Sequence, residues 1–190
     1  MKRLIKKIIY FSCLITVAPL AALYKMTGSK DLFAGQAQLL SLVPGKIGSH
    51  IRIAYYHLVL DKCPLDGYIG FGSFFAHTDV EIGCGVYIGA YCVMGKVKIH
   101  DHATIASGVY ILSGKNQHGY KEIGKPIQMQ PGTFKQISIG SNCWIGNGAI
   151  IMANVGTQNV VASGAVIASD TDDYVVVAGN PAALVKRLVE

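Results

Sequence analysis

The residue best placed for chemistry in this 190-residue chain is His118, which lies in the segment Asn116-Gln-His-Gly119 and two positions before Tyr120. An imidazole has an unperturbed pKa of about 6.5, so it can accept a proton from a weak acid near neutral pH. The segment therefore predicts a general base at His118. The alternative interpretation is a solvated loop histidine with no part in catalysis.

A period of six residues runs on both sides of this histidine. The residue after most of the aliphatic anchors is small, and a small or β-branched residue usually follows four places after each anchor. Neither a helical period of 3.6 nor simple strand alternation produces this pattern, whereas a parallel β-helix does. Three hexapeptides then make one triangular coil of about eighteen residues. The anchors are Ile82, Ile88, Met94, Ile99, Ile105, Ile111, Ile139, Ile145 and Ile151.

The repeat is interrupted between Ile111 and Ile139, which are 28 positions apart. One coil needs about eighteen residues, so roughly ten residues must leave it. We expect residues 112–136 to form a protruding loop that carries His118. Loops held out from a rigid scaffold are where catalytic and binding groups concentrate.

Other polar residues fall at turns of the expected coil. His77 and Asp79 lie about two coils before the loop, and His100 and His102 form an isolated H-x-H pair. Such a pair lacks a third ligand, so we expect no metal site there.

The apolar share, the charge balance and the cysteines indicate what kind of protein this is. The apolar share of 51% allows a substantial core. The 17 Lys and Arg residues exceed the 11 Asp and Glu residues, and no nucleic-acid-binding motif accompanies them, so the charge favours a membrane surface or a phosphate-bearing ligand and not nucleic acid. The five cysteines show no C-x-x-C pair, which favours reduced, buried thiols.

The N-terminus predicts a membrane-anchoring segment over residues 1–27. Four basic residues (Lys2, Arg3, Lys6 and Lys7) precede an apolar run from Ile8 to Tyr24, which would be roughly 25 Å long as a helix. The run could span a bilayer with its basic end inside, serve as a secretory signal, or enter the membrane only partway with a bend at Pro19.

Residues 28–67 are expected to join this segment to the solenoid. The polar, glycine-bearing stretch 27–38 predicts a linker. Pro44-Gly45 then opens an amphipathic helix to about Leu60, with Arg52 on its basic face. Such a helix would contact an anionic membrane face or pack across the open end of the solenoid, and the two are compatible.

Three motifs resemble those of the hexapeptide-repeat acyltransferases, in particular the sugar and polysaccharide O-acetyltransferases. They are Ile139-Gly-Ser-Asn-Cys-Trp-Ile-Gly-Asn-Gly148, the looped-out Asn116-Gln-His-Gly119, and Val177-Ala-Gly-Asn-Pro-Ala182 followed by Lys186-Arg187. The resemblance implies a left-handed β-helix, an exception to the usual right-handed crossover. It also implies a catalytic domain over residues 68–180, a C-terminal tail over 181–190, and a homotrimer with acetyl-CoA between neighbouring coils.

The resemblance further implies transfer of an acetyl group from acetyl-CoA to a hydroxyl of a sugar, a polysaccharide or a lipid-linked glycan precursor. His118 would take the hydroxyl proton, N–H donors would hold the tetrahedral oxyanion, and the CoA thiolate would leave. Direct transfer is favoured over an acyl-enzyme, because Gly70-Phe-Gly-Ser-Phe74 lacks the final glycine of a G-x-S-x-G nucleophile motif.

The remaining roles follow from the same resemblance. Asn116 would assist His118, and the acceptor would be held by His77, Asp79 and Tyr120. The pantetheine arm would lie along the glycine-rich corners, and basic residues near the C-terminus would meet the CoA phosphates. These cofactor-binding residues are Trp144, Gly146, Asn147, Ala162, Gly164, Lys186 and Arg187.

The N-terminal run sets the chain apart from the soluble sugar acetyltransferases and creates a conflict. Acetyl-CoA is cytoplasmic, yet a spanning helix with its basic end inside would export the catalytic domain. We therefore expect a monotopic or re-entrant anchor, with the solenoid at the cytoplasmic face of the inner membrane.

Two other functions stay open at this point. A zinc enzyme resembling the β-helical carbonic anhydrases would need a histidine five residues after His118, where Ile123 stands. A non-catalytic membrane-bound scaffold would explain the anchor and the solenoid, but it leaves the loop without a purpose.

Overall fold

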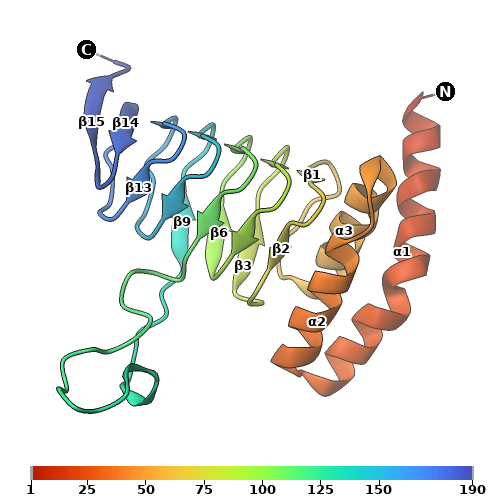
Figure 1. Ribbon diagram of the computed structural model, residues 1–190. Helices are drawn as coiled ribbons and strands as arrows, with labels where there is room; N and C mark the ends of the chain where they lie inside the picture. The colour runs from red at the N-terminus through yellow and green to blue at the C-terminus, as the bar shows by residue number, and fades with distance from the viewer. Residues whose placement is uncertain (1, 190) are drawn as a thin grey trace.

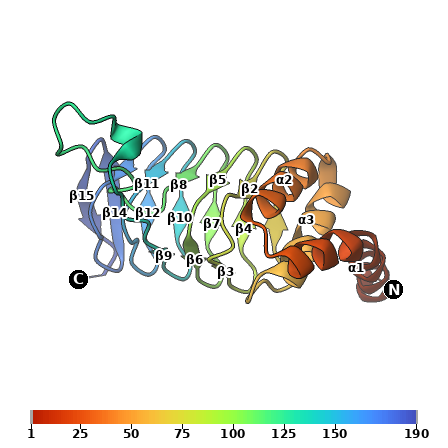
Figure 2. The same cartoon turned by 90° about the horizontal axis from the view of Figure 1, so that it is seen from below.

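The protein is a short solenoid with three helices packed on its N-terminal end (Figure 1). The computed structural model describes residues 2–189, with side chains from residue 7 onward. The helices are α1 (Lys2–Thr27), α2 (Lys30–Ser41) and α3 (Gly45–Val59). The two termini lie at opposite ends of the molecule, and α1 is the outermost element (Figure 2).

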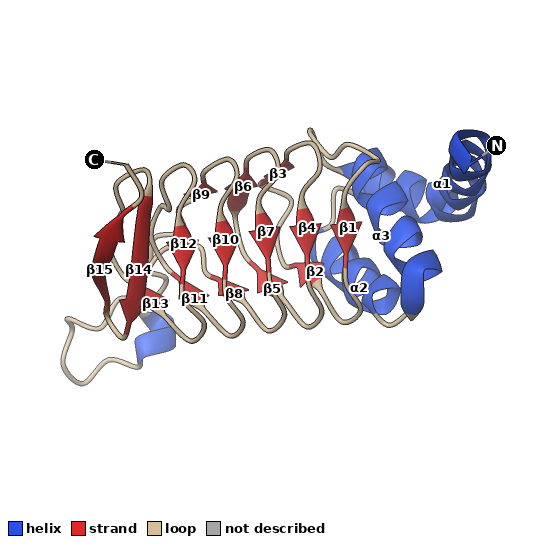
Figure 3. Cartoon of the chain, turned by 90° about the horizontal axis from the view of Figure 1, so that it is seen from above, coloured by secondary structure: helices blue, strands red, loops and turns tan. Residues whose placement is uncertain are grey.

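Except for the last two strands, consecutive strands belong to different sheets, and each strand pairs in parallel with its equivalent in a neighbouring coil (Figure 3). The five-stranded sheet holds β2 (Phe74–Phe75), β5 (Val93–Met94), β8 (Tyr110–Ile111), β11 (Ile150–Ile151) and β13 (Val166–Ile167). The three-stranded sheet holds β3 (Val80–Ile82), β6 (Val97–Ile99) and β9 (Ile137–Ile139). The seven-stranded sheet holds β1 (Tyr68–Ile69), β4 (Tyr87–Ile88), β7 (Thr104–Ile105), β10 (Trp144–Ile145), β12 (Val160–Val161), β14 (Val175–Gly179) and β15 (Ala182–Arg187). Paired parallel strands are three apart in the chain up to β10 and β11, and two apart after them. The predicted left-handed parallel β-helix is confirmed.

The predicted anchors fill the interior of the coil. All nine are at most 4% exposed, and the small residues between them are buried as well. In the register of the five-stranded sheet, Met94 lies directly over Ile111, which lies over Ile151. Cys92 and Cys143 occupy small-residue positions in this core, and burial raises the pKa of both thiols. They pack as small apolar groups.

The segment 30–41 is a helix, whereas the sequence predicted a linker there. The Ser29 hydroxyl accepts a hydrogen bond from the Leu32 N–H at 3.2 Å and so caps the N-terminus of α2. Phe33, Ala37 and Leu40 lie on one face and are buried. This helical spacing of apolar residues was present in the sequence, but the polar residues between them concealed it.

Arg52 does not lie on an exposed basic face, as its place in the predicted amphipathic helix implied. Its side chain is fully buried beneath α2 and the first coil. The guanidinium donates to the carbonyl of Ile69 at 2.9 and 3.1 Å and to the carbonyl of Val43 at 2.8 Å. It also donates to the carbonyls of Leu40 and Ser41 at the end of α2, which in addition accept from the N–H groups of Val43 at 3.4 Å and Gly72 at 2.8 Å, respectively. Arg52 therefore ties α2 and α3 to the solenoid.

The C-terminal segment is also more ordered than the predicted tail. β15 turns back and pairs antiparallel with β14, so it covers the last edge of the seven-stranded sheet. Helices therefore cover one end of the coil, and a hairpin covers the edge of the seven-stranded sheet at the other end (Figure 1).

We expect Arg52→Ala to destabilise the protein by about 3 kcal/mol, because it removes a buried donor from four carbonyls, of which, among the described residues, only those of Leu40 and Ser41 keep a backbone N–H partner outside the helices. Chemical denaturation followed by circular dichroism measures the loss. Lys46→Ala, at an exposed position on the same helix, is the matched control and should change little. An unfolding midpoint for Arg52→Ala equal to that of the control would contradict this role.

Candidate active site

Residues 112–136 leave the coil between β8 and β9 and project from its side (Figure 1). Two backbone hydrogen bonds close the neck of this loop. Lys135 N–H donates to the Ser113 carbonyl at 2.9 Å, and Thr133 N–H donates to the Asn116 carbonyl at 2.7 Å. The two limbs of the loop therefore run side by side before it opens out around His118.

Gln130 holds the outer part of the loop together. Its side chain is 6% exposed, although most of its neighbours are exposed. The amide oxygen accepts from Glu122 N–H at 3.0 Å, and the amide nitrogen donates to the carbonyls of Glu122 and Lys125 at 3.0 Å each. Sequence reasoning missed this residue, because nothing distinguishes it from the nearby Gln128 and Gln136.

A cavity of about 470 Å³ surrounds His118, and it is lined entirely by loop residues. Three residues with predicted roles, Asn116, His118 and Tyr120, line it together, and Gln130 and Thr133 line it as well. His118 and Tyr120 are exposed, so a ligand has free access to both side chains. The loop thus brings the predicted base and its two predicted partners into one place.

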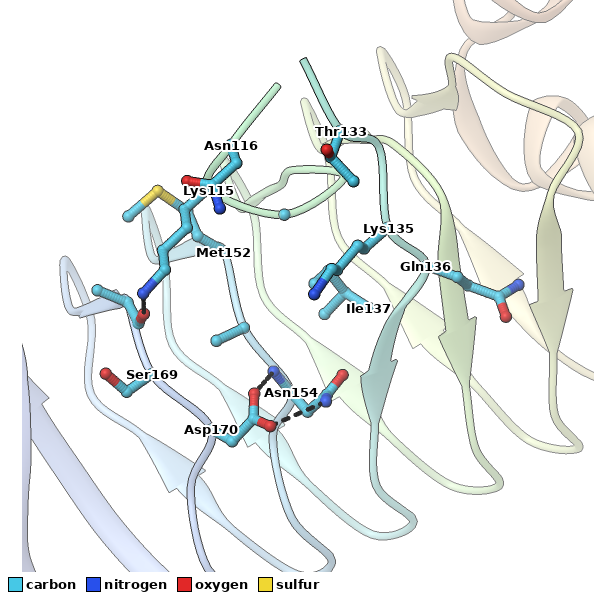
Figure 4. Close-up of a pocket in the computed structure, with 13 residues that line it drawn as sticks. Lys115, Asn116, Thr133, Lys135, Gln136, Ile137, Met152, Asn154, Ser169 and Asp170 are labelled. Atoms are coloured by element: carbon cyan, nitrogen blue, oxygen red, sulfur yellow. Dashed lines mark hydrogen bonds between the residues drawn. The ribbon is translucent and has the colours of Figure 1, made fainter. Parts of the chain in front are cut away.

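A second cavity of about 410 Å³ lies at the neck of the loop, against the corners of the next two coils (Figure 4). Asn116 and Thr133 line both cavities. Lys115 and Lys135 extend along the neck cavity from the two limbs, and the Lys115 ammonium donates to the Ala168 carbonyl at 3.5 Å.

The floor of the neck cavity is a polar pair on the coil. Asp170 accepts from the Asn154 N–H at 2.8 Å and from its side-chain amide at 3.2 Å. Two cationic side chains therefore face one carboxylate across the cavity, which leaves an excess of positive charge for an anionic ligand. The sequence analysis did not identify Asn154 or Asp170, because only the coil stacking places them beside the loop.

His77 and Asp79 lie beneath the returning limb of the loop and do not line the cavity of His118. The His77 ring contacts Phe134 edge to face, with centroids 5.9 Å apart. The Asp79 carboxylate binds Lys96 at 2.7 Å, and the Gln136 side chain donates to the Asp79 carbonyl at 3.2 Å. Within one chain, the predicted acceptor residue Tyr120 therefore lies at the His118 cavity, whereas His77 and Asp79 lie outside it.

The electrostatics of the pair His77 and Asp79 favour a neutral histidine. Partial burial lowers the pKa of His77, and nearby Lys96 lowers it further, against an opposing effect of Asp79. The hydrogen bond from Lys96 lowers the pKa of Asp79. A neutral imidazole beside an ionised carboxylate can both accept and donate hydrogen bonds, as polyhydroxyl ligands require.

The predicted pantetheine-binding residues lie along neighbouring corners of two successive coils. Trp144 is 56% exposed on β10, next to Val160 of β12. Gly164 N–H donates to the Asn147 carbonyl at 2.8 Å, and a side chain at Gly164 would meet open space. Gly146 differs, because a Cβ there would lie 2.5 Å from the Ser163 nitrogen of the next coil. That glycine is required for coil stacking, whereas the corner formed by Asn147, Ala162 and Gly164 is open to a ligand.

Lys186 and Arg187 are on β15, at the far end of the coil. The Arg187 guanidinium donates to the Asp172 carboxylate at 2.9 Å in an exposed ion pair. Among the described residues, no group of three or more His, Cys, Asp or Glu side chains converges as ligands for a metal ion.

Comparison with known proteins identifies the repeat. Residues 79–113 match the family described as bacterial transferase hexapeptide (six repeats). A Saccharomyces cerevisiae protein provisionally named an acetyltransferase is 30% identical over 118 residues, which cover 58% of this chain and 60% of that protein. The chloramphenicol acetyltransferase of Escherichia coli is 27% identical over 115 residues, covering 53% of this chain and 50% of that enzyme. The chain thus spans little more than half the length of these relatives.

Solved structures share the fold at lower identity. A hexapeptide-repeat-containing acetyltransferase from Vibrio cholerae has a TM-score of 0.72 and 20% identity, covering 85% of this chain and 93% of its own. A galactoside acetyltransferase in complex with coenzyme A has a TM-score of 0.69 and 18% identity, covering 84% of this chain and 80% of its own. The family model thus matches the repeat over residues 79–113, and the solved structures match the fold of the chain.

Proposed function

We propose that the protein is an acyl-CoA-dependent O-acetyltransferase that acetylates a hydroxyl group of a sugar, a polysaccharide or a lipid-linked glycan precursor. The observation that carries this proposal is the presentation of His118, with Asn116 and Tyr120, in one accessible cavity on a loop held by a rigid hexapeptide coil. The relatives named as acetyltransferases support the reaction class, and the galactoside acetyltransferase supports a carbohydrate acceptor.

In the proposed reaction, the imidazole of His118 accepts the proton of the acceptor hydroxyl as its oxygen attacks the thioester carbonyl of acetyl-CoA. The tetrahedral intermediate collapses by breaking the carbon–sulfur bond, and the imidazolium returns the proton to the departing thiolate. Asn116 orients the imidazole or the acceptor. Both substrates are bound together in the proposed reaction, and the acceptor occupies the cavity around His118.

Acetyl-CoA is proposed to run along the open corner at Asn147, Ala162 and Gly164, where the space beside Gly164 leaves room for the pantetheine arm. Trp144 borders this corner and is exposed enough to contact the ligand. Lys186 supplies positive charge for the phosphates of CoA. Arg187 does the same by leaving its exposed ion pair with Asp172 and binding a phosphate instead.

We further propose that the enzyme is a homotrimer, because the three faces of the coil differ in chemistry. Outward side chains on the three-stranded sheet are polar, with Lys98 bound to Glu81 at 2.9 Å. The outward ladder of the five-stranded sheet is entirely apolar: Phe74, Val93, Tyr110, Ile150 and Val166. The outward ladder of the seven-stranded sheet is mainly apolar over its first five strands: Tyr68, Tyr87, Thr104, Trp144 and Val160.

In a trimer of triangular prisms, each chain presents two faces to its neighbours and keeps one in solvent. Two apolar faces and one polar face fit that arrangement. A neighbouring chain could then bring a second group of acceptor residues, such as His77 and Asp79, to the His118 loop.

His118→Ala should lower acetyl transfer by roughly 10²- to 10⁴-fold while leaving acetyl-CoA affinity unchanged, because only the proton transfer is lost. The measurements are calorimetric titration with acetyl-CoA and thiol release in the presence of a carbohydrate extract. His57→Ala, which removes an exposed histidine of α3, is the matched control. If the wild-type protein does not bind acetyl-CoA, the enzyme proposal fails. That result would favour the alternative of a non-catalytic membrane-bound scaffold.

Gln130→Ala should loosen the loop without unfolding the coil. We expect kcat to fall roughly 10- to 100-fold, because His118 is no longer held in one position. Limited proteolysis should cut the loop faster, and the unfolding temperature should stay near that of the wild type. Lys125→Ala is the control, since its exposed ion pair with Glu122 contributes little. Equal proteolysis of the two variants would show that Gln130 is not the anchor.

Val93→Glu places a charge in the middle of the apolar ladder and should reduce the species in solution from three 20.3-kDa chains to one. Size-exclusion chromatography with light scattering gives the mass. Ser138→Glu, on the polar face, should leave the assembly intact. A trimeric Val93→Glu protein would mean that another face forms the interface.

A further inference from the structure

Helix α1 is apolar on both of its long faces, which is unusual for a helix at the surface of a soluble protein. Its inner face packs against the rest of the helical cap. The buried side chains recur at helical spacing at Tyr10, Cys13, Val17 and Ala21, and the Tyr10 ring meets His50 of α3 edge to face at 4.7 Å.

The outer face carries large apolar side chains in place of the expected polar ones. Phe11 is 65% exposed, Ile15 is 59% exposed and Met26 is 85% exposed, and Ile8 and Leu23 are exposed on the same side. At 100° per residue these five positions lie opposite the buried stripe. The most apolar 18-residue window of the segment Lys7–Thr27 has a mean hydropathy of 1.7, and only 22% of that window is buried.

The charges on α1 indicate what this face contacts. Residues 2–27 contain Lys2, Arg3, Lys6, Lys7 and Lys25 and no Asp or Glu. The side chains of the first three lie outside the described residues, whereas Lys7 and Lys25 are exposed near the two ends of the apolar face. An exposed apolar face with cationic ends and no acidic residue complements an anionic lipid surface.

The packing of the inner face determines how the helix meets the membrane. A helix that crossed a bilayer perpendicular to it would have to withdraw Tyr10, Cys13 and Val17 from α3 and expose the apolar surface they cover. A helix lying in the plane of the interface keeps these contacts and buries only its outer face.

We propose that the outer face of α1, formed by Ile8, Phe11, Ile15, Leu23 and Met26, binds an anionic bilayer in the plane of the headgroups, so that the protein is a monotopic membrane protein. The lipid binding itself is independent of the proposed acetyl transfer, whereas the choice of membrane face rests on it. Attachment from the cytoplasmic side of the inner membrane keeps the solenoid in the compartment that contains acetyl-CoA.

The test is flotation of the full-length protein with vesicles. We expect the wild type to float with vesicles of phosphatidylglycerol and phosphatidylcholine, and to bind pure phosphatidylcholine more weakly. Phe11→Ser combined with Ile15→Ser should weaken binding at least roughly tenfold, because two large apolar side chains no longer enter the lipid. The unfolding temperature should change little, since both side chains are mostly exposed.

Leu184→Ser is the matched control, because it removes an exposed apolar side chain at the opposite end of the molecule. Equal flotation of the double variant and this control would overturn the proposal. So would a wild-type protein that ignores vesicles and instead associates with itself through α1, as detected by light scattering without lipid.

Orientation is tested by adding Lys7→Cys and Lys25→Cys variants, in a Cys84→Ser background, to sealed vesicles. An in-plane helix leaves both ends open to a membrane-impermeant maleimide added outside. Protection of Lys7→Cys alone would show a spanning helix and would overturn the monotopic arrangement.

Discussion

The structure depends on closing the two open ends of a stack of parallel coils. Each coil satisfies its backbone hydrogen bonds only through the coils above and below it, so the first and last coils are left with groups that need partners. At the first coil, Arg52 donates to the Ile69 carbonyl and to three carbonyls around the end of α2. At the last coil, β15 pairs with β14. A buried guanidinium can serve one coil and one helix at once, because its five N–H groups form a planar fork.

The coil gives the candidate site its stability, and the loop keeps His118 accessible. The coil is filled by branched aliphatic side chains in register, so the points where the loop leaves and rejoins it are fixed. The loop has few buried side chains and relies on Gln130 and on the neck hydrogen bonds. It therefore keeps His118 accessible while its root stays in one place. The separation of the His118 cavity from His77 and Asp79 within one chain fits a site that is completed between chains.

Much of the fold follows from local spacing, and for that reason it could be predicted. The period of six specifies which residue faces inward at every step, and a 28-residue gap at Ile111 can only be a loop. Most features that escaped prediction are non-local. Arg52 looks like a surface residue until α2 folds over it. The exception is α2, whose helical spacing is local but was concealed by the polar residues between Phe33, Ala37 and Leu40. The contact of His77 with Phe134 joins residues far apart in sequence, and Asp170 reaches the loop only through coil stacking. The individual roles of His118, Trp144 and Lys186 remain predictions.

The stacking of whole coils also fixes the distance between the N-terminal helices and the loop. Neighbouring strands in a sheet are about 4.8 Å apart, and the loop follows β8, the third strand of the five-stranded sheet counted from the helical cap. The distance from the cap to the loop is therefore set in discrete steps. Adding or removing one complete coil before β8 would shift His118 by about 4.8 Å along the axis and leave its chemistry unchanged. In this architecture, evolution can change the distance between the helices and His118 by duplicating a coil, without changing the residues that react.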